Sequence, residues 1–224
     1  MQKLIRSLLA TMLAVTLSVA LAPVASSAPL NWSSVFEGPS QKIYRSGEIH
    51  KGDASTLKSR GVTTIVAYTG SNPRISGVNF VKVKMSGLGV GGVSTAKGVS
   101  LYKKFVTTSR RNALGTALIV IANAPGSVVV QCWKGKDRTG WTVAILGHIL
   151  GQSESQMIRE FVKYRPGKSS WLKASLNEAE KKYGSLDGFL DKIGVTAEVR
   201  DLIRSKYAEP SSEPTPEPTP EPTP

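Results

Sequence analysis

Residues 127–140 read Ser-Val-Val-Val-Gln-Cys-Trp-Lys-Gly-Lys-Asp-Arg-Thr-Gly, and this stretch decides the fold. Its three consecutive valines indicate a buried strand, because β-branched side chains suit a pleated sheet and an unbroken apolar run is typical of a strand covered on both faces. The apolar residues 141–150 follow and predict a helix that opens at Thr139 and Gly140. The sequence therefore predicts a strand, a short polar loop and a helix start, in that order.

This order of elements is suited to binding an anion. The N–H groups of such a loop converge on one point, and the N-terminus of the helix adds partial positive charge. Cys132 stands at the start of the loop, where the same groups stabilise a thiolate. Arg138, at the far end, supplies a planar pair of donors for phosphoryl oxygens. A thiolate beneath a phosphate that an arginine holds is suited to accepting a phosphoryl group on sulfur.

The nine residues Cys-Trp-Lys-Gly-Lys-Asp-Arg-Thr-Gly, at positions 132–140, resemble the phosphate loop of the cysteine-based protein tyrosine phosphatase superfamily. They are most similar to its bacterial tyrosine/dual-specificity branch, whose loop reads Cys-x-x-Gly-Lys-Asp-Arg-Thr-Gly. Residues 183–190 and 193–196 are similar to the C-terminal helical pattern of the tyrosine/lipid phosphatases of that branch. The resemblance spans roughly residues 42–207. The alternative is a buried structural cysteine beside a surface lysine cluster.

The expected fold class is α/β, with a central, mostly parallel sheet flanked by helices and the phosphate site beyond the carboxyl end of a strand. Residues 29–40 are expected to form a polar lead-in, and the glycine-rich residues 86–94 a mobile loop that flanks the site. Further strands are expected at residues 42–47, 62–68 and 78–85, the last of them nearer the sheet edge. Helices are expected at residues 54–60, 99–111, 116–124, 154–164, 170–183, 186–193 and 197–207.

The resemblance implies a role for each residue of the loop. Cys132 would attack phosphorus, Arg138 and the loop amides would hold the equatorial oxygens, and Thr139 would donate to the thiolate and ease its departure. The substrate contacts would come from Trp133, Lys134, Gly135, Lys136 and Gly140. The two lysines resemble those that meet additional phosphates in phosphoinositide phosphatases, with general electropositivity as the alternative. Trp133 would form a pocket wall or pack on the adjoining helix.

The general acid is where the chain departs from the superfamily. Members usually bring an aspartate from a loop some tens of residues before the cysteine, yet no Asp or Glu lies between Asp53 and Asp137. Asp137 is the nearest candidate for the acid, and its alternative role is to order the loop by pairing with a lysine. Glu48 and Asp53 depend on how the chain folds.

Two further positions bear on the loop. Gln131 stands where the superfamily normally has a histidine, and glutamine keeps hydrogen bonding without a charge. Arg45 lies in a Tyr-Arg-Ser segment. A similar segment lies behind the phosphate loop in exported and dual-specificity members of the superfamily. Arg45 would therefore support the loop, unless it is a plain surface arginine.

The N-terminal residues of the chain indicate export. Residues 1–28 combine a basic start, an apolar run at 8–22 and a small-residue exit, as secretory signal peptides do, with an uncleaved membrane anchor as the alternative. A single cysteine excludes an internal disulfide. Residues 29–208 are expected to form the phosphatase-like domain. Residues 209–224, with repeated Glu-Pro-Thr-Pro, are expected to be a disordered tail.

Charge limits the partners. The net charge is +13, and residues 29–208 carry 27 basic and 12 acidic side chains, which gives +15. Such a field attracts phosphorylated substrates, nucleic acid or anionic lipid surfaces. No recognition motif with interleaved aromatics appears, so nucleic acid is not expected. No metal-ligand cluster appears either, so neither a metal nor another cofactor is expected.

These features predict an exported, metal-independent phosphatase that acts on phosphotyrosine, with dual specificity included, through a phosphocysteine intermediate. Two alternatives stay open. One is a phosphoinositide or inositol-phosphate phosphatase. The other is a catalytically weak, phosphate-binding pseudophosphatase that contacts an anionic surface.

Overall fold

The computed structural model describes residues 28–208, so the predicted tail and all but the last residue of the predicted signal peptide lie outside the described residues. Within them a five-stranded sheet has the order β1-β2-β5-β3-β4. Its strands are β1 (Ser33–Glu37), β2 (Lys42–Ser46), β3 (Val62–Ala67), β4 (Asn79–Lys82) and β5 (Ser127–Gln131). Only β1 runs antiparallel to its neighbour. The mostly parallel α/β sheet is confirmed, and β4 lies at its edge as predicted.

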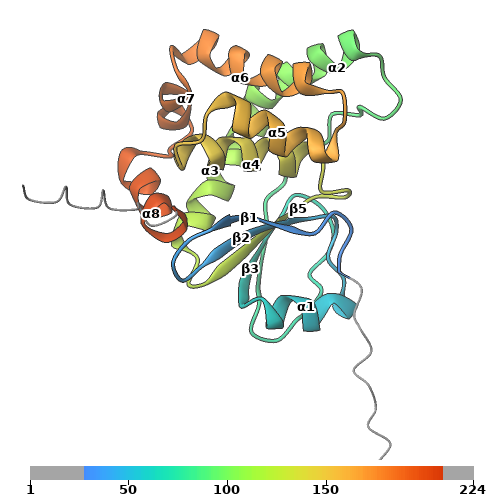
Figure 1. Cartoon of the computed structure of the whole chain (residues 1–224), viewed down its shortest axis with the longest axis vertical. Helices are drawn as coiled ribbons and strands as arrows, with labels where there is room; N and C mark the ends of the chain where they lie inside the picture. The colour runs from blue at the N-terminus through green and yellow to red at the C-terminus, as the bar shows by residue number, and fades with distance from the viewer. Residues whose placement is uncertain (1–27, 209–224) are drawn as a thin grey trace, which may run out of the picture.

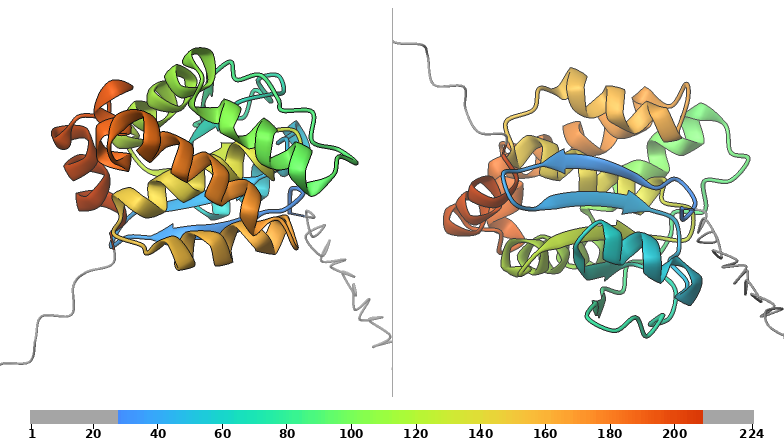
Figure 2. Two further views of the ribbon diagram at one scale, coloured as in Figure 1. Left: turned by 90° about the horizontal axis from the view of Figure 1, so that it is seen from above. Right: turned by 60° about the horizontal axis from the view of Figure 1, so that its bottom comes forward.

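Helices cover the two faces of the sheet unequally (Figure 1). Helix α1 lies on one face, and most of the other helices lie on the opposite side (Figure 2). In chain order they are η1 (Lys51–Asp53), α1 (Ala54–Ser59), α2 (Thr95–Tyr102), η2 (Lys103–Val106), α3 (Thr108–Asn123), α4 (Asp137–Ile149), α5 (Glu154–Tyr164), α6 (Ser169–Tyr183), α7 (Leu186–Lys192) and α8 (Ala197–Tyr207), η1 and η2 being 3-10 helices. None of those between residues 28 and 208 is both long and apolar enough to cross a bilayer.

Strand β5 is buried on both faces, as its valine run predicts. Val128 and Val130 pack into the larger core together with helices α3 and α4, whereas Val129 packs into a smaller core with Leu57 of α1. Successive side chains of a strand point to opposite faces, so each face of β5 needs an apolar cover. The strand lies between β2 and β3, both parallel to it. The carboxyl ends of the three strands therefore meet at one edge of the sheet, and Cys132 follows β5 at that edge.

Two expectations about the elements are wrong. Residues 29–40 are not a plain lead-in, because they contain β1, whose Phe36 is buried and whose ladder pairs with β2. The single helix expected at 99–111 is broken: α2 ends at Tyr102 and α3 begins at Thr108, after an extended Thr107. The break lets Tyr102 and Phe105 both turn into the core, where their rings pack edge-on with centroids 5.2 Å apart.

The C-terminal helices follow the prediction closely. Helix α5 begins with the expected capping box, in which Ser153 and Gln156 bond each other's backbone N–H. Helix α4 begins at Asp137, two residues earlier than expected, so Asp137 and Arg138 form the first turn of the helix rather than the loop.

Candidate active site

The segment from Cys132 to Lys136 joins β5 to α4 and forms a compact loop. The Gly135 N–H donates to the Cys132 carbonyl at 3.3 Å, and Gly135 has a φ of +63°. A Cβ on Gly135 would lie 2.5 Å from the Ser46 carbonyl carbon, so no other residue fits without movement. Cys132 is 3% exposed at the floor of this loop, in contact with the larger core.

Arg45 holds the loop from beneath. It is fully buried, and its Nη2 donates to the Gly135 carbonyl at 2.7 Å while Nη1 donates to Glu160 at 3.2 Å. Its guanidinium carbon lies 3.6 Å from the ring centroid of Tyr164. Burial lowers the pKa of the Arg45 guanidinium, and the Glu160 carboxylate opposes this shift. The prediction that Arg45 supports the loop is confirmed, and the surface alternative is wrong.

Gln131 joins the two chain segments that flank β5. Its Oε1 accepts from the Ile49 N–H at 2.8 Å, and its Nε2 donates to the Thr69 carbonyl at 3.1 Å. The side chain is fully buried. A neutral amide with one acceptor and two donors satisfies both backbone groups, which explains how glutamine serves at a position where the superfamily has histidine.

Asp137 is held by an arginine rather than by the lysine that was expected. The Arg165 Nε donates to Oδ1 at 2.7 Å and Nη2 donates to Oδ2, while the Tyr102 hydroxyl also donates to Oδ1. Burial and the neighbouring Asp137 carboxylate raise the pKa of Tyr102, so the phenol stays a donor. Both carboxylate oxygens of Asp137 therefore accept hydrogen bonds, and a proton on either oxygen would compete with those bonds. This geometry favours a loop-ordering role over that of general acid.

Arg138 contacts the glycine-rich segment, residues 86–94. Its Nη1 donates to the Met85 carbonyl at 3.0 Å, and a Cβ on Gly87 would lie 3.9 Å from the guanidinium carbon. From α3, Arg110 donates to the carbonyls of Ser86 and Gly87, both at 3.1 Å. The glycine-rich segment therefore flanks the site, as expected. It contains no acidic residue.

Thr139 and Gly140 lie within the first turns of α4. The Thr139 hydroxyl is fully buried and has no hydrogen-bond partner among the residues that the structure describes. Its donation to the Cys132 thiolate stays a prediction. A Cβ on Gly140 would lie 3.0 Å from the Phe161 ring, so this glycine permits the close approach of α4 and α5.

The rim of the loop carries Trp133, Lys134 and Lys136. Trp133 is 64% exposed, so the expectation that it packs on the adjoining helix is wrong. The Lys134 Nζ lies 4.7 Å from the centroid of its ring. Lys134 is exposed and Lys136 is partly exposed. Substrate contacts by these residues, and by Gly135 and Gly140, whose N–H groups donate to the carbonyls of Cys132 and Lys136, stay predictions.

Sequence reasoning missed a pair that supports Arg138 from the core. The Thr142 hydroxyl donates to the Arg138 carbonyl at 2.9 Å, so the buried Tyr68 hydroxyl, 2.7 Å from Thr142 Oγ1, is the donor of that second bond. Burial raises the pKa of Tyr68 and keeps its phenol protonated. The i, i+4 spacing of Arg138 and Thr142 could have suggested the first bond, whereas nothing in the sequence points to Tyr68. Sequence reasoning also missed Arg110, Arg165 and Tyr102, because nothing in the sequence points to their contacts either.

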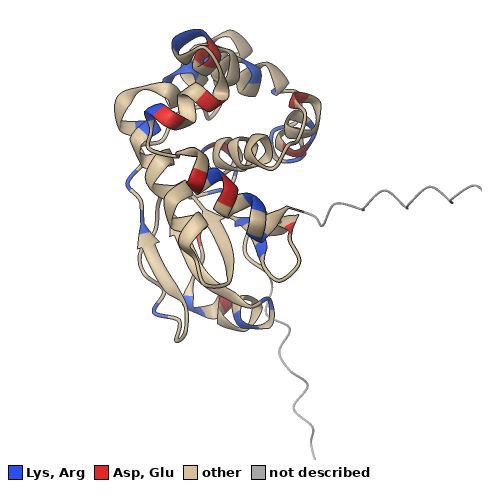
Figure 3. Cartoon of the chain, turned by 90° about the vertical axis from the view of Figure 1, so that its left-hand side faces the viewer, with Lys and Arg blue, Asp and Glu red and all other residues tan. Residues whose placement is uncertain are grey.

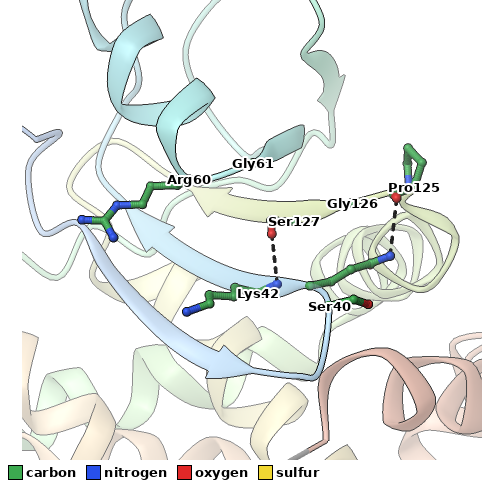
Figure 4. A pocket seen from close by; sticks show the side chains of 8 residues that line it. Ser40, Lys42, Arg60, Gly61, Pro125, Gly126 and Ser127 are labelled. Carbon is green, nitrogen blue, oxygen red and sulfur yellow. Dashed lines mark hydrogen bonds between the residues drawn. The ribbon is translucent and has the colours of Figure 1, made fainter.

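An open hollow of about 480 Å³ lies at the other end of the sheet (Figure 4). It is lined by Lys42, Arg60 and Ser127, and the Lys42 N–H donates to Ser127 Oγ at 3.0 Å. Because Ser127 begins β5, the length of that strand, roughly 15 Å, separates this hollow from the Cys132 loop.

Within residues 28–208 no group of three or more His, Cys, Asp or Glu side chains could hold a metal ion.

Cys132 is a buried thiol at the carboxyl end of a parallel strand. The loop after it turns at Gly135 and leads into α4, which carries Arg138 in its first turn. This arrangement is that of a cysteine-dependent phosphatase. The comparisons agree: a profile described as "Tyrosine phosphatase family" matches residues 39–209, and the chain belongs to that family. The family makes the chain a phosphoric monoester hydrolase. None of the curated proteins compared matches the chain.

One solved structure shares the fold at low identity, and two others are similar to a lesser degree. The Siw14 catalytic core is 19% identical with a TM-score of 0.52, and the match covers 79% of this chain and 91% of that chain. A core catalytic domain of the PP-IP phosphatase SIW14 from S. cerevisiae, in complex with citrate, is 19% identical with a TM-score of 0.48, covering 74% and 98%. TpbA from P. aeruginosa is 15% identical with a TM-score of 0.40, covering 77% and 99%.

Proposed function

We propose that the chain is an exported phosphatase that hydrolyses phosphotyrosine through a phosphocysteine. The observation that carries the proposal is the loop itself: Cys132 at the end of β5, with Gly135 fixed by Arg45 and with Arg138 in the first turn of α4. The Cys132 thiolate attacks phosphorus, so the S–P bond forms as the bond to the leaving oxygen breaks. Water then attacks the phosphocysteine, phosphate departs and the thiolate is restored. Arg138 and the loop N–H groups stabilise the charge on the equatorial oxygens.

The carboxylates near the loop indicate which kind of leaving group the site accepts. Residues 54–136 contain no acid, and both oxygens of Asp137 are engaged by Arg165 and Tyr102. A phenol departs with less protonation than an aliphatic alcohol does, because its pKa of about 10 is far lower. The site therefore suits phosphotyrosine better than phosphoserine or phosphothreonine.

The distribution of charge favours a second candidate, a phosphoinositide or inositol phosphate. Residues 29–150 carry 16 basic side chains and only four acidic ones, whereas eight of the twelve acids between 29 and 208 lie in residues 154–201. Figure 3 shows acidic residues among the basic ones on these later helices. At the loop, Lys134 and Lys136 lie on the rim and Arg110 holds the flanking segment. Additional phosphates on a substrate would meet these cations.

One experiment separates these candidates and the pseudophosphatase. The chain from Ala28 onward and its Cys132→Ser variant are assayed with chelator on a phosphotyrosine peptide, a phosphoserine peptide, a phosphoinositide and an inositol polyphosphate. We expect turnover of the phosphotyrosine peptide that Cys132→Ser abolishes. Preferred turnover of the inositol lipids or phosphates would favour the second candidate. Phosphate binding by the parent without any turnover would contradict both.

Export is proposed from the composition of residues 1–28. Its test is to express the full chain in a bacterium with an intact secretory pathway and to sequence the N-terminus of the product outside the cytoplasm. A product that begins near Ala28 supports export. A full-length product retained with the cytoplasmic proteins contradicts it.

A further inference from the structure

Two large apolar side chains lie exposed at the Cys132 loop, on segments that both approach Gly47. Leu30 is 59% exposed and Trp133 is 64% exposed. Gly47 lies between them: its N–H donates to the Leu30 carbonyl, and a Cβ on it would lie 3.1 Å from Leu30 Cβ and 3.3 Å from the Trp133 carbonyl oxygen. A single exposed apolar residue needs no explanation, but two on neighbouring segments at the rim of a site indicate a contact surface.

Hydrogen bonds to two backbone carbonyls of the loop hold this surface in place. The Asn31 side chain donates to the Lys134 carbonyl at 2.7 Å, and the Glu48 N–H donates to the Trp133 carbonyl at 3.3 Å. Asn31 itself takes a φ of 54°, in the left-handed region, which turns the chain beside Leu30. The N-terminal segment and the catalytic loop are thus joined, and each carries one exposed apolar side chain.

The charge beside the two apolar side chains is positive. The Lys134 ammonium lies over the Trp133 ring, 4.7 Å from its centroid, and Lys136 follows two residues later. Tryptophan is favoured at the boundary between lipid headgroups and acyl chains, leucine enters the acyl region, and lysine reaches the phosphates. Residues 29–208 add a net charge of +15, which attracts an anionic surface over a longer range.

We propose that Leu30, Trp133 and Lys134 form an interfacial patch that rests on an anionic lipid bilayer. Because the patch adjoins the catalytic loop, this contact would place the Cys132 site at the level of the headgroups and of phosphorylated groups attached there. The proposal concerns lipid binding alone and does not depend on which phosphate monoester is hydrolysed.

The binding test uses the chain from Ala28 onward, since both hydrophobic cores lie within residues 28–208. Cosedimentation is measured with vesicles of phosphatidylcholine alone and with phosphatidylglycerol added. Both lipids are phosphodiesters, so binding is separated from phosphomonoester turnover. We expect binding only with phosphatidylglycerol, weakened about tenfold by Leu30→Gln and about fivefold by Lys134→Gln. Leu202→Gln is the matched control, because Leu202 is also exposed (37%) but lies on α8.

Tryptophan fluorescence gives an independent readout. Trp141 and Trp171 are 0% and 2% exposed, and Trp32 is stacked on Tyr44, so Trp133 is the most exposed indole. We expect its emission to shift to shorter wavelength on anionic vesicles, and the shift to disappear in Trp133→Phe. Hydrolysis of a small soluble aryl phosphate by Leu30→Gln should be unchanged.

Several results would overturn the proposal: no binding to anionic vesicles, equal binding by Leu30→Gln and the parent, or an equal loss in Leu202→Gln. If vesicles do not bind but Leu30→Gln raises KM for phosphotyrosine peptides only, the patch is a peptide subsite and the lipid proposal is wrong.

Discussion

The Arg165 guanidinium binds both carboxylate oxygens of Asp137 and thereby joins the first turn of α4 to the connection between α5 and α6. Asp137 precedes Arg138, so the ion pair fixes the backbone from which the phosphate-binding arginine extends. The two side chains are 21% and 22% exposed, which leaves water limited access to the pair. The position of Arg138 depends in this way on a residue outside the phosphate loop.

Replacing Asp137 by Asn tests whether it orders the loop or acts as a general acid. If it orders the loop, kcat should fall by a similar factor, about 100-fold, for an acidic nitrophenol leaving group and for a less acidic phenol. The measurement is a series of aryl phosphates assayed with parent and variant. A loss that grows steeply with the pKa of the leaving group would assign the acid role to Asp137. Arg165→Gln should share the uniform loss, whereas Arg159→Gln, on the exposed side of α5, should not.

Arg45→Met should lower the free energy of unfolding by about 3 kcal/mol, because it leaves Glu160 Oε1 and the buried Gly135 carbonyl without the Arg45 donor, although Lys163 still pairs with Glu160 Oε2. Urea unfolding measures the change, with Arg159→Met as the exposed control. Equal stability of Arg45→Met and the parent would show that Arg45 does not hold the loop.

Gly135→Ala should abolish turnover, because a Cβ there would lie 2.5 Å from the Ser46 carbonyl group and Gly135 has a φ of +63°. Gly167→Ala is the control: its φ is +68°, but a Cβ there would have no atom within 4 Å. The control should cost about 1–2 kcal/mol of stability from backbone strain alone and keep its turnover. Similar activity of the two variants would contradict a packed phosphate loop.

Stability should decrease in alkali. Burial raises the pKa of Tyr68, Tyr102 and Tyr207. A group with a raised pKa in the folded state contributes stability that is complete below its unfolded pKa, about 10, and is lost as the pH rises above that value. Urea unfolding between neutral pH and strong alkali should show this fall, and Tyr207→Phe should make it shallower. An unchanged slope in Tyr207→Phe would contradict the contribution of that phenol.

The parts of the site that the sequence predicts are those set by neighbouring residues. The valine run of β5, the loop from Cys132 and the apolar start of α4 each follow from local pattern and resemblance, and so does the capping box of α5. Apart from the i, i+4 bond from Thr142 to Arg138, the contacts that sequence reasoning missed join residues far apart in the chain. Arg165 lies 28 positions from Asp137, and Tyr68 lies 74 positions from Thr142.

The two wrong elements have a similar cause. Strand β1 forms because β2 offers an open edge and Phe36 finds a place in the core, neither of which is visible in the polar composition of residues 29–40. The helix expected at 99–111 breaks because tertiary packing of Tyr102 and Phe105 overrides the local helical period.

The most direct test of the account is to trap the intermediate. A phosphotyrosine peptide is mixed with the chain, the reaction is quenched in acid within the first turnover, and the protein is digested for mass spectrometry. We predict one phosphoryl group on the peptide that contains Cys132, present in the parent and absent in Cys132→Ser. Steady turnover by Cys132→Ser, or a phosphoryl group found only on another residue, would contradict the claim that the Cys132 sulfur attacks phosphorus.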